Sequence, residues 1–276
     1  MENLVSLNLG GNQFFDLIPS TLGGLTKLKI LDLSSNKLHS TPSTIGNLTN
    51  LRLLNLSFNF FDGPIPSTLS HLTNLRILDL SFDYFDGLIP SSLGNLTQLS
   101  TLNLKSNQIT GSIGFGFGDL KNVQILDLSD NSIVGPIPSI LGNLAQLNTL
   151  NLNSNQITGF IGFDFGDFKN VQILDLSYNS FVGPIPSTLS HFKKLMVLDL
   201  SYNNFVGPIP STLCYNLTML TTLDLSHNQI IGSIPYEFGN LKHLFVLHLS
   251  YNELDGPIPA ALGHLTNLKK TDLSKN

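Results

Sequence analysis

The sequence predicts an α/β solenoid in which every repeat contributes one short strand to a parallel sheet. A unit of the form L-x-x-L-x-L-x-x-N returns about every 24 residues through the whole 276-residue chain. Inside each unit the leucines alternate with polar residues, as in a strand with one buried face. A period in this range is typical of proteins whose repeats stack and share one continuous core.

The final Asn of the unit sets the register of the repeats. It falls at Asn12, Asn36, Asn59, Asn107, Asn131, Asn155, Asn179, Asn203, Asn228, Asn252 and Asn276, and Asp83 occupies the one other position of the series. Successive positions are 24 residues apart, except for an interval of 23 that ends at Asn59 and one of 25 that ends at Asn228. Twelve copies therefore predict a single domain spanning residues 1–276.

Each unit contains one predicted strand. In the segment Leu75-Arg-Ile-Leu78-Asp79-Leu80, the two later leucines alternate with Asp79, so they face the core while the carboxylate faces away from it. Parallel strands lie about 4.8 Å apart, which predicts an inner sheet roughly 50 Å long.

The Asn that follows each strand is expected to be buried and to pair with backbone groups that the turn leaves open, because an amide both donates and accepts. Stacked copies would form an asparagine ladder. Asp83 can only accept hydrogen bonds when it is ionised, so we expect a local weak point there unless neighbours supply extra donors. The substitution Asp83→Asn is expected to stabilise the protein.

The second half of the unit carries a G-P-I-P motif. Its copies are Gly63-Pro-Ile65-Pro66, Gly135-Pro-Ile137-Pro138, Gly183-Pro-Ile185-Pro186, Gly207-Pro-Ile209-Pro210 and Gly256-Pro-Ile258-Pro259. Gly permits a positive φ, Ile is expected to fill the core, and Pro fixes an extended path. The segment that follows, such as Leu93-Gly94-Asn-Leu96, would bury two more leucines on an irregular or 3-10 convex side.

This motif, with L-D-L-S-x-N ahead of it and L-G-N-L-T behind it, resembles the plant-specific class of leucine-rich repeats over essentially the whole chain. Phrases such as Asn107-Gln-Ile-Thr-Gly-Ser-Ile and Leu174-Asp-Leu-Ser-Tyr-Asn resemble the ectodomains of plant leucine-rich-repeat receptor-like kinases and receptor-like proteins. The resemblance implies a right-handed superhelix or horseshoe with its parallel sheet on the concave face. It also implies an extracellular peptide or protein ligand on that face, and contact with a co-receptor that has a shorter leucine-rich-repeat domain.

The same resemblance implies a parent protein in the plasma membrane with extracellular repeats, or one secreted to the cell wall. The chain departs from the family pattern because it has no Trp and a single Cys, so the N- and C-terminal cysteine caps are not recognisable. Its N-terminus also has no secretory signal peptide, and it has no apolar run of transmembrane length. We therefore expect part of a sensing domain, with any kinase activity outside this chain.

Composition argues against several other functions. The net charge is −5, with 14 Lys and Arg against 19 Asp and Glu, so the electrostatic basis of nucleic-acid binding is missing. One cysteine, Cys214, allows no internal disulfide and no cysteine-based metal site, and we expect it to be buried. No membrane contact, metal or other cofactor is expected within the chain.

Two patterns could be mistaken for chemical sites. The run Gly114-Phe-Gly-Phe-Gly118 resembles a phosphate loop only in its glycines, since it has neither the following helix nor the Lys. Its aromatic residues recur two repeats later: Phe117 and Phe165 align with a buried Leu, whereas Phe115 and Phe163 align with an exposed Ser. The Asp column, which holds Asp32, Asp79, Asp127, Asp175, Asp199 and Asp224, is interpreted as framework because L-D-L-S is common to the family.

The candidate ligand site is the inner face of the predicted sheet. One column follows the first Leu of each unit and grades from basic to polar to apolar: Lys29, Arg52, Arg76, Ser100, Gln124, Asn148, Gln172, Met196, Thr221 and Phe245. A second column precedes the Asn and carries Phe58, Phe82, Tyr178, Tyr202, His227 and Tyr251. Exposed aromatic side chains are common anchors for extended partners. A further hypothesis is that Arg52 and Arg76 attract an acidic ligand, which unchanged binding after both are replaced by Ala would refute.

Four N-x-S/T sequons suggest N-glycosylation, at Asn47, Asn95, Asn216 and Asn55. The first three share the loop before the strand. Asn55 lies within a predicted strand, where a glycan would obstruct the inner face.

A recognition module in a receptor is the leading interpretation of function. The alternative is an inhibitor of a cell-wall polygalacturonase, a class that keeps both cysteine caps. An ice-binding role would need a regular array such as Thr, and Thr101, Thr149 and Thr222 share their column with Ile and Val. No catalytic constellation has a recognisable sequence context, so an enzyme is not expected.

Overall fold

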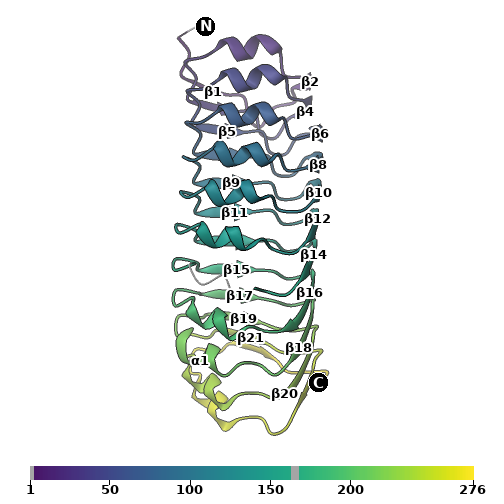
Figure 1. Cartoon of the computed structure of the whole chain (residues 1–276), viewed down its shortest axis with the longest axis vertical. Coiled ribbons are helices and arrows are strands. Elements are labelled where there is room, and N and C mark those ends of the chain that lie inside the picture. The colour runs from purple at the N-terminus through teal and green to yellow at the C-terminus, as the bar shows by residue number, and fades with distance from the viewer. Residues whose placement is uncertain (1–2, 163–167) are drawn as a thin grey trace. The chain divides into compact units, whose positions relative to one another are not determined.

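The computed structural model describes residues 3–162 and 168–276. The chain forms two compact units, residues 1–134 and 135–276, and each is described by itself. Within each unit the chain coils through successive repeats, and corresponding strands of neighbouring repeats lie side by side (Figure 1). This is the stacking of a leucine-rich-repeat solenoid, as the period predicts.

The first half of every repeat supplies a strand of the main sheet. Its strands in the first unit are β1 (Ser6–Asn8), β3 (Ile30–Asp32), β5 (Leu53–Asn55), β7 (Ile77–Asp79), β9 (Thr101–Asn103) and β11 (Ile125–Asp127); in the second unit they are β13 (Thr149–Asn151), β15 (Ile173–Asp175), β17 (Val197–Asp199), β19 (Thr222–Asp224), β21 (Val246–His248) and β23 (Lys270–Asp272). Neighbouring strands are parallel and in chain order, with equivalent residues paired, such as Leu31 with Leu54.

The second half of the repeat supplies a further set of parallel strands, which form the side sheet. The first unit contains β2 (Phe15–Leu17), which pairs with β4 (Lys37–Ser40), and then β6 (Asp62–Pro64), β8 (Tyr84–Leu88) and β10 (Gln108–Gly111). The next strand, β12 (Ser132–Gly135), begins in the first unit and ends at the first residue of the second. The second unit contains β14 (Gln156–Gly159), β16 (Ser180–Pro184), β18 (Asn204–Gly207), β20 (Gln229–Ser233) and β22 (Glu253–Asp255). The glycine of the G-P-I-P motif has a positive φ, for example 71° at Gly63 and 82° at Gly183, as predicted.

Single helical turns complete the repeats. They are η1 (Ser20–Gly24), η2 (Ser43–Asn47), η3 (Ser67–His71), η4 (Ser91–Asn95), η5 (Phe115–Asp119), η6 (Ser139–Asn143), η8 (Ser187–His191), η9 (Tyr236–Asn240), η10 (Ala260–His264) and the α-helical turn α1 (Thr212–Asn216). The α-helical turn lies in the one interval with an additional residue, between Asn203 and Asn228. Across residues 3–162 and 168–276, no helix has the length and apolarity that a bilayer crossing needs.

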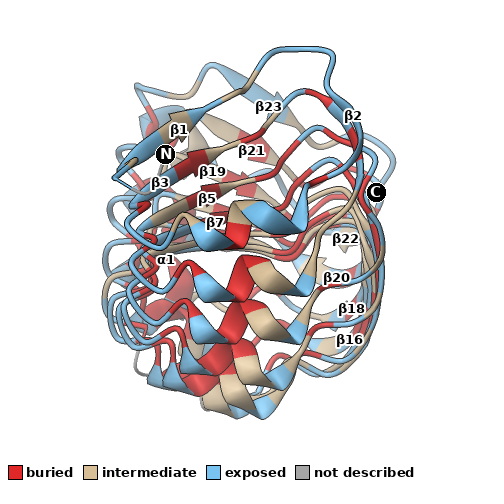
Figure 2. Ribbon diagram, turned by 90° about the horizontal axis from the view of Figure 1, so that it is seen from above, coloured by how far each residue is buried: buried red, intermediate tan, exposed pale blue. Residues whose placement is uncertain are grey.

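The core lies inside the coil of each repeat, where the buried residues gather (Figure 2). The central Leu of a main-sheet strand and the Leu that follows it are fully buried, as Leu78 and Leu80 show, and so are Leu93 and Leu96 in and directly after η4. Adjacent turns approach so closely that a Cβ on Gly94 would lie 2.2 Å from the Gly116 carbonyl oxygen. Glycine is therefore required by packing between repeats at this position.

Several predicted core positions agree with the structure. Phe117 is buried in the Leu position, Phe115 is 80% exposed, and Cys214 is buried, which raises the pKa of its thiol to about 12. The prediction for Ile258 is wrong, because its side chain is 71% exposed: no described repeat packs on its outer side. Phe163 and Phe165 lie outside the described residues.

The predicted asparagine ladder is present. Asn36, Asn59, Asn203 and Asn252 are buried as predicted, whereas the other interior members are half-buried and Asn12 and Asn276 are exposed. The Asn203 side-chain Oδ1 accepts a hydrogen bond from the Phe181 N–H at 3.0 Å, and its Nδ2 donates to the carbonyl oxygens of Leu176, Leu200 and Ser201 at 3.0, 3.2 and 3.0 Å. Asn59 makes the same four kinds of contact. One amide therefore satisfies backbone groups of its own repeat and of the preceding one.

Asp83 fills the same position with a carboxyl group. Its Oδ1 accepts from the N–H groups of Asn59 at 3.0 Å and Phe61 at 3.1 Å. Its Oδ2 stands where the other repeats have the donating Nδ2, and within the described part of the chain it has no hydrogen-bond partner. Burial raises the pKa of Asp83 to about 8, and the nearby Asp79 adds to the shift. No extra donors compensate, so this repeat is the expected weak point.

We predict that Asp83→Asn raises the free energy of unfolding at pH 7 by about 1–3 kcal/mol, because the amide supplies its donors at every pH, whereas the buried carboxyl group must take up a proton on folding before it can donate. Since the pKa is raised on folding, the contribution of Asp83 is most favourable below about pH 4 and is lost as the pH rises to about 8. Thermal unfolding of both proteins between pH 4 and pH 9 measures this, and the variant should show the weaker pH dependence.

The reciprocal control is Asn203→Asp, which should lower stability and introduce a similar pH dependence in the second unit. A lower melting temperature for Asp83→Asn would contradict this account of the ladder.

Candidate functional site

The open face of the main sheet consists of the side chains that point away from the leucine core. In the main-sheet strands from β3 to β21, the first and third residues point outward while the Leu between them is buried, as Leu54 in β5 and Leu198 in β17 show. The residue before each strand and the residue before each ladder Asn flank these positions. Four parallel columns of side chains therefore run along each unit, one residue per repeat.

The predicted basic-to-apolar column lies immediately before the strands. The Arg52 N–H donates to the Lys29 carbonyl at 2.8 Å, and the Arg76 N–H donates to the Arg52 carbonyl at 2.8 Å, which holds these residues in adjacent positions. The exposed members of the predicted set are Lys29, Arg52, Arg76 and Gln124 in the first unit, and Met196 and Phe245 in the second, where Gln172 is half-buried.

The predicted aromatic column forms stacked rings. In the first unit, Phe58 and Phe82 stack with centroids 4.3 Å apart. In the second unit, the aromatic ladder comprises Tyr178, Tyr202, His227 and Tyr251. Its successive centroids are 4.0, 3.9 and 4.2 Å apart, with interplanar angles of 11° to 13°. Tyr178, Tyr202 and Tyr251 are nevertheless 51%, 39% and 48% exposed, because only the ring faces are covered.

Every residue of this column has left-handed backbone. The φ angles are 51° at Tyr178, 52° at Tyr202 and 55° at Tyr251, and the equivalent Ser106 has 52°. This conformation costs roughly 1–2 kcal/mol for a residue with a Cβ and is least unfavourable for Gly, Asn and Asp. Aromatic residues are therefore a poor choice for the turn itself, and stacking of about 0.5–1.5 kcal/mol per pair only offsets the cost.

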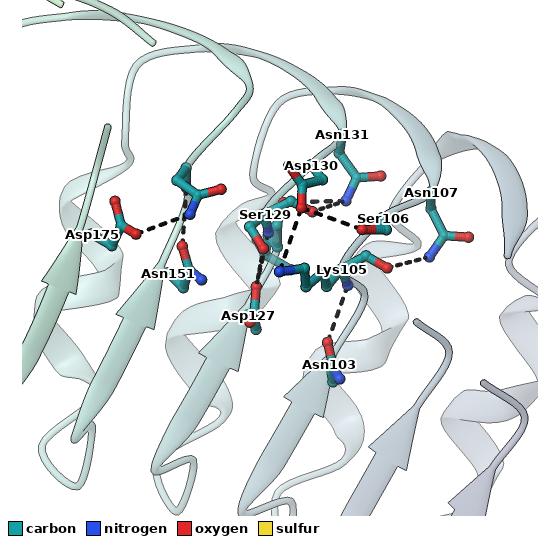
Figure 3. A network of polar contacts seen from close by, with 12 residues as sticks. Asn103, Lys105, Ser106, Asn107, Asp127, Ser129, Asp130, Asn131, Asn151 and Asp175 are labelled. Carbon is teal, nitrogen blue, oxygen red and sulfur yellow. Dashed lines mark hydrogen bonds and ion pairs between the residues drawn. The ribbon is translucent and has the colours of Figure 1, made fainter. Parts of the chain in front are cut away.

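The Asp column has a structural role, as interpreted. In β17, Oδ1 of Asp199 accepts from the Ser201 N–H at 2.9 Å and from the Ser201 hydroxyl at 2.7 Å. The same pair of bonds joins Ser129 to Asp127 (Figure 3). An amide serves equally well, since Asn55 accepts the same two bonds from Ser57 at 3.1 and 2.8 Å. The turn thus requires an acceptor oxygen but no charge.

The charge pattern of this column differs between the units. In the first unit carboxylates alternate with amides, in the order Asp32, Asn55, Asp79, Asn103 and Asp127, and Asn103 Nδ2 donates to Asp79 Oδ2 at 3.2 Å. In the second unit Asp175, Asp199 and Asp224 follow one another on β15, β17 and β19, and we call them the carboxylate row. The next residue, His248 on β21, contacts Asp224 Oδ2 through Nδ1 at 3.0 Å.

Burial raises the pKa of Asp199 to about 6, and the flanking Asp175 and Asp224 add to the shift. The influence of the row reaches the aromatic ladder. A hydrogen bond with Tyr202 raises the pKa of Tyr178, and the negative charges of Asp199 and Asp224 raise it further. The row and the ladder therefore share one electrostatic environment.

The column formed by the first residue of each strand was considered in the sequence only as an ice-binding array of Thr residues, and its Ile residues were not included in the predicted ligand site. Its exposed apolar members are Ile30, Ile77, Ile125 and Ile173, with exposed fractions of 36–41%. Because β-branched apolar side chains are typical of core residues, these Ile residues were not expected on the open face. Counting the alternation backwards from the buried Leu would have placed them on the open face.

A hollow of about 420 Å³ lies beside the aromatic pair of the first unit. It is lined by Asn36, Phe58, Asn59, Phe60, Phe82, Asp83, Tyr84 and Ser106. Near its margin, Lys105 lies 5.8 Å from the Phe82 ring centroid and forms an ion pair with Asp130 at 3.5 Å, and Ser106 donates to the same carboxylate (Figure 3).

The sequons fall into two structural classes. Asn47, Asn95 and Asn216 are exposed and each is the last residue of its helical turn, in η2, η4 and α1. Asn55 is half-buried in β5, where its side chain holds Ser57. The first three have the accessibility that glycosylation needs. In the run Gly114–Gly118, Gly114 precedes η5 (Phe115–Asp119) and the other residues lie within it, a turn equivalent to those of other repeats.

We predict that Asp199→Asn increases stability near pH 7 by about 1 kcal/mol and weakens the pH dependence between pH 4 and 6. The reason is that the folded state binds the Asp199 proton more tightly than the unfolded chain, so its contribution falls as the pH rises through this window. The amide oxygen still accepts from Ser201. Denaturant unfolding at several pH values is the measurement.

The matched control is Asp32→Asn, because Asp32 lies between Asn8 and Asn55 in the first unit and already accepts from Asn8 Nδ2 at 3.4 Å. It should bring no gain. An equal gain for both variants would show that adjacent carboxylates are not the cause.

Comparison with protein-family models supports the fold. The leucine-rich-repeat models match residues 2–61, 121–181 and 169–230, and shorter single-repeat models match residues 74–96, 98–120 and 243–265. No curated protein matches the chain significantly.

Solved plant structures are similar over nearly the whole chain. The plant peptide hormone receptor RGFR1, in complex with RGF2, is 30% identical with a TM-score of 0.91, and the match covers 100% of this chain and 48% of that one. The Arabidopsis receptor kinase HAESA, in complex with an extended IDA peptide hormone, is 30% identical with a TM-score of 0.77, covering 99% and 54%. A second HAESA structure, with IDA and the co-receptor SERK1, has 31% identity, a TM-score of 0.57 and coverage of 99% and 58%.

A plant ice-binding protein is 30% identical with a TM-score of 0.68, and the match covers 98% of this chain and 82% of that one. The chain spans about half the length of the receptor ectodomains that it matches. The family models cover more than half of its residues in the register of the observed strands and turns. The chain belongs to the leucine-rich-repeat family.

Proposed function

We propose that this chain is a peptide- or protein-recognition module, part of the ligand-sensing ectodomain of a plant cell-surface receptor-like kinase or receptor-like protein. The observation that carries the proposal is the aromatic column of the open face. Its residues have left-handed backbone that the repeat needs, but the repeat does not need aromatic side chains there, since Ser106 adopts the same φ. Exposed aromatic residues that the fold does not require are suited to binding.

The similar receptor ectodomains support this proposal, because RGFR1 and HAESA are seen with peptide hormones. By the same similarity the partners would be an extracellular peptide and a co-receptor such as the one bound to HAESA. The parent protein would then lie in the plasma membrane with its repeats outside the cell. Glycans at Asn47, Asn95 and Asn216 would leave the open face free, since those residues end the helical turns.

We predict that peptides selected by this chain bind its open face. Decapeptides from a random phage-displayed library are selected on the immobilised chain, synthesised and measured by fluorescence anisotropy. Tyr202→Asn and Phe82→Asn are the test variants, because Asn tolerates the left-handed backbone and removes only the ring. At least one of them should weaken binding of a selected peptide by tenfold or more.

The control is Phe115→Ser, which removes an 80% exposed aromatic residue from a helical turn at a position that is Ser in other repeats. Binding should be unchanged. The proposed function would be refuted if the selected peptides bound both open-face variants as tightly as the unmodified chain, or if the selection yielded no peptide.

Ice binding is a second candidate, favoured by the match that covers 82% of the plant ice-binding protein. A regular array of apolar side chains lies on the side sheet of the second unit, where Val182, Val206 and Ile231 are 39%, 39% and 47% exposed. Ice binding predicts that the chain inhibits ice recrystallisation and that Val206→Lys abolishes this inhibition. Ordinary crystal growth in the presence of the unmodified chain would reject this candidate.

A further inference from the structure

The open face of the second unit has two features that the leucine-rich-repeat framework does not explain. The turn before each ladder Asn requires a positive φ, which Ser106 supplies without an aromatic ring. The turn after each strand requires an acceptor oxygen, which Asn55 supplies without a charge. The carboxylate row nevertheless lies on β15, β17 and β19, and the aromatic ladder follows these strands and β21, which lie side by side in the second unit (Figure 1).

The stacking of the aromatic ladder restricts what it can bind. Its rings lie 3.9–4.2 Å apart and nearly parallel, so each interior ring has both faces covered by its neighbours. A ligand that must stack on a free aromatic face, such as a sugar or a planar ring, finds no such face on Tyr202 or His227. The ladder presents ring edges and tyrosine hydroxyl groups along its length, which suits the side chains and backbone of an extended segment.

The carboxylate row sets the charge of this surface. Neighbouring strands place the three carboxylates about 4.8 Å apart. Among the described residues, no Lys or Arg forms an ion pair with Asp175, Asp199 or Asp224; the ion-pair contact to the row is that of His248 with Asp224. Asp175 Oδ2 accepts from Asn153 Nδ2 at 2.9 Å, which is a neutral donor. The negative charge is therefore largely uncompensated within the unit.

Resting on the proposed function, we propose that the open face of β15, β17, β19 and β21 binds an extended peptide segment bearing Lys or Arg side chains. The segment lies along the aromatic ladder, and its cationic side chains contact the carboxylate row. The first unit is less suited to such a segment, because its carboxylates alternate with amides and Lys29, Arg52 and Arg76 line the adjacent column.

The dimensions of an extended chain fit this arrangement. Alternate side chains of an extended segment point the same way about 6.8 Å apart, and the row spans about 10 Å, so two cationic side chains face it together. The spacing of alternate peptide side chains differs from that of the carboxylates, and the long, flexible stems of Lys and Arg can bridge this difference. The same stems can pack on the ring edges of the aromatic ladder. Each guanidinium or ammonium group then reaches at least one carboxylate.

The test uses the decapeptides selected from the random library on the whole chain. Their sequences should be enriched in Lys and Arg at alternate positions. The variant Asp175→Asn/Asp199→Asn/Asp224→Asn retains the acceptor oxygens for the turns and should bind them at least tenfold more weakly. Peptides with Lys and Arg replaced by Glu should lose at least tenfold on the unmodified chain, which tests the inference without changing the protein.

The matched control is Asp32→Asn/Asp79→Asn/Asp127→Asn, the same three changes in the first unit, which should alter binding less than twofold. Circular dichroism and thermal unfolding verify that both triple variants fold. Selected peptides that are neutral or acidic, or equal losses for both triple variants, would overturn the inference while leaving peptide recognition intact. A library that yields no peptide sensitive to the open face would overturn the proposed function, and this inference with it.

Discussion

The asparagine ladder is the interaction on which the rest of each unit depends. One side-chain amide per repeat accepts a backbone N–H and donates to three carbonyl groups, two in its own repeat and one in the preceding repeat. The chain can then leave the strand through a left-handed residue without stranding polar groups in the leucine core. Asp83 shows the cost of changing one member, because its second oxygen is buried without a partner.

The repeat is specified by the asparagine ladder, the Leu core and the turn in which an Asp or Asn side-chain oxygen accepts from Ser. The fold therefore does not depend on the identity of the outward side chains. Residues such as Arg76 and Phe245 vary in charge and size while the strand beneath them keeps its register. In the aromatic ladder, Tyr178 and Tyr202 even adopt a left-handed backbone conformation that is unfavourable for aromatic residues. Unfavourable local choices that stacking only offsets are typical of positions retained for binding.

Much of this architecture could be predicted because the determinants are local and recur. The period located the strands, the ladder and the buried Ile65, and alternation placed Arg52 and Tyr202 on the open face. Other features depend on three-dimensional spacing. Ring stacking and left-handed backbone at Tyr178 follow from turn geometry, and Ile77 was missed because an exposed Ile is indistinguishable in sequence from a buried one. The functional meaning of the carboxylate row could not be recognised in the sequence. The L-D-L-S motif is already explained by the framework role that Asp199 has, and that role needs an acceptor oxygen but no charge.

The central claim is that framework and recognition positions are separate columns of the same repeat. A saturation-mutagenesis scan of the surface-displayed chain, read out by display level, tests it directly. The account predicts that the ladder Asn and strand Leu positions tolerate almost no substitution, whereas the columns of Arg76 and Tyr202 tolerate most of them. Display levels that fall as steeply in the outward columns as in the ladder would contradict it.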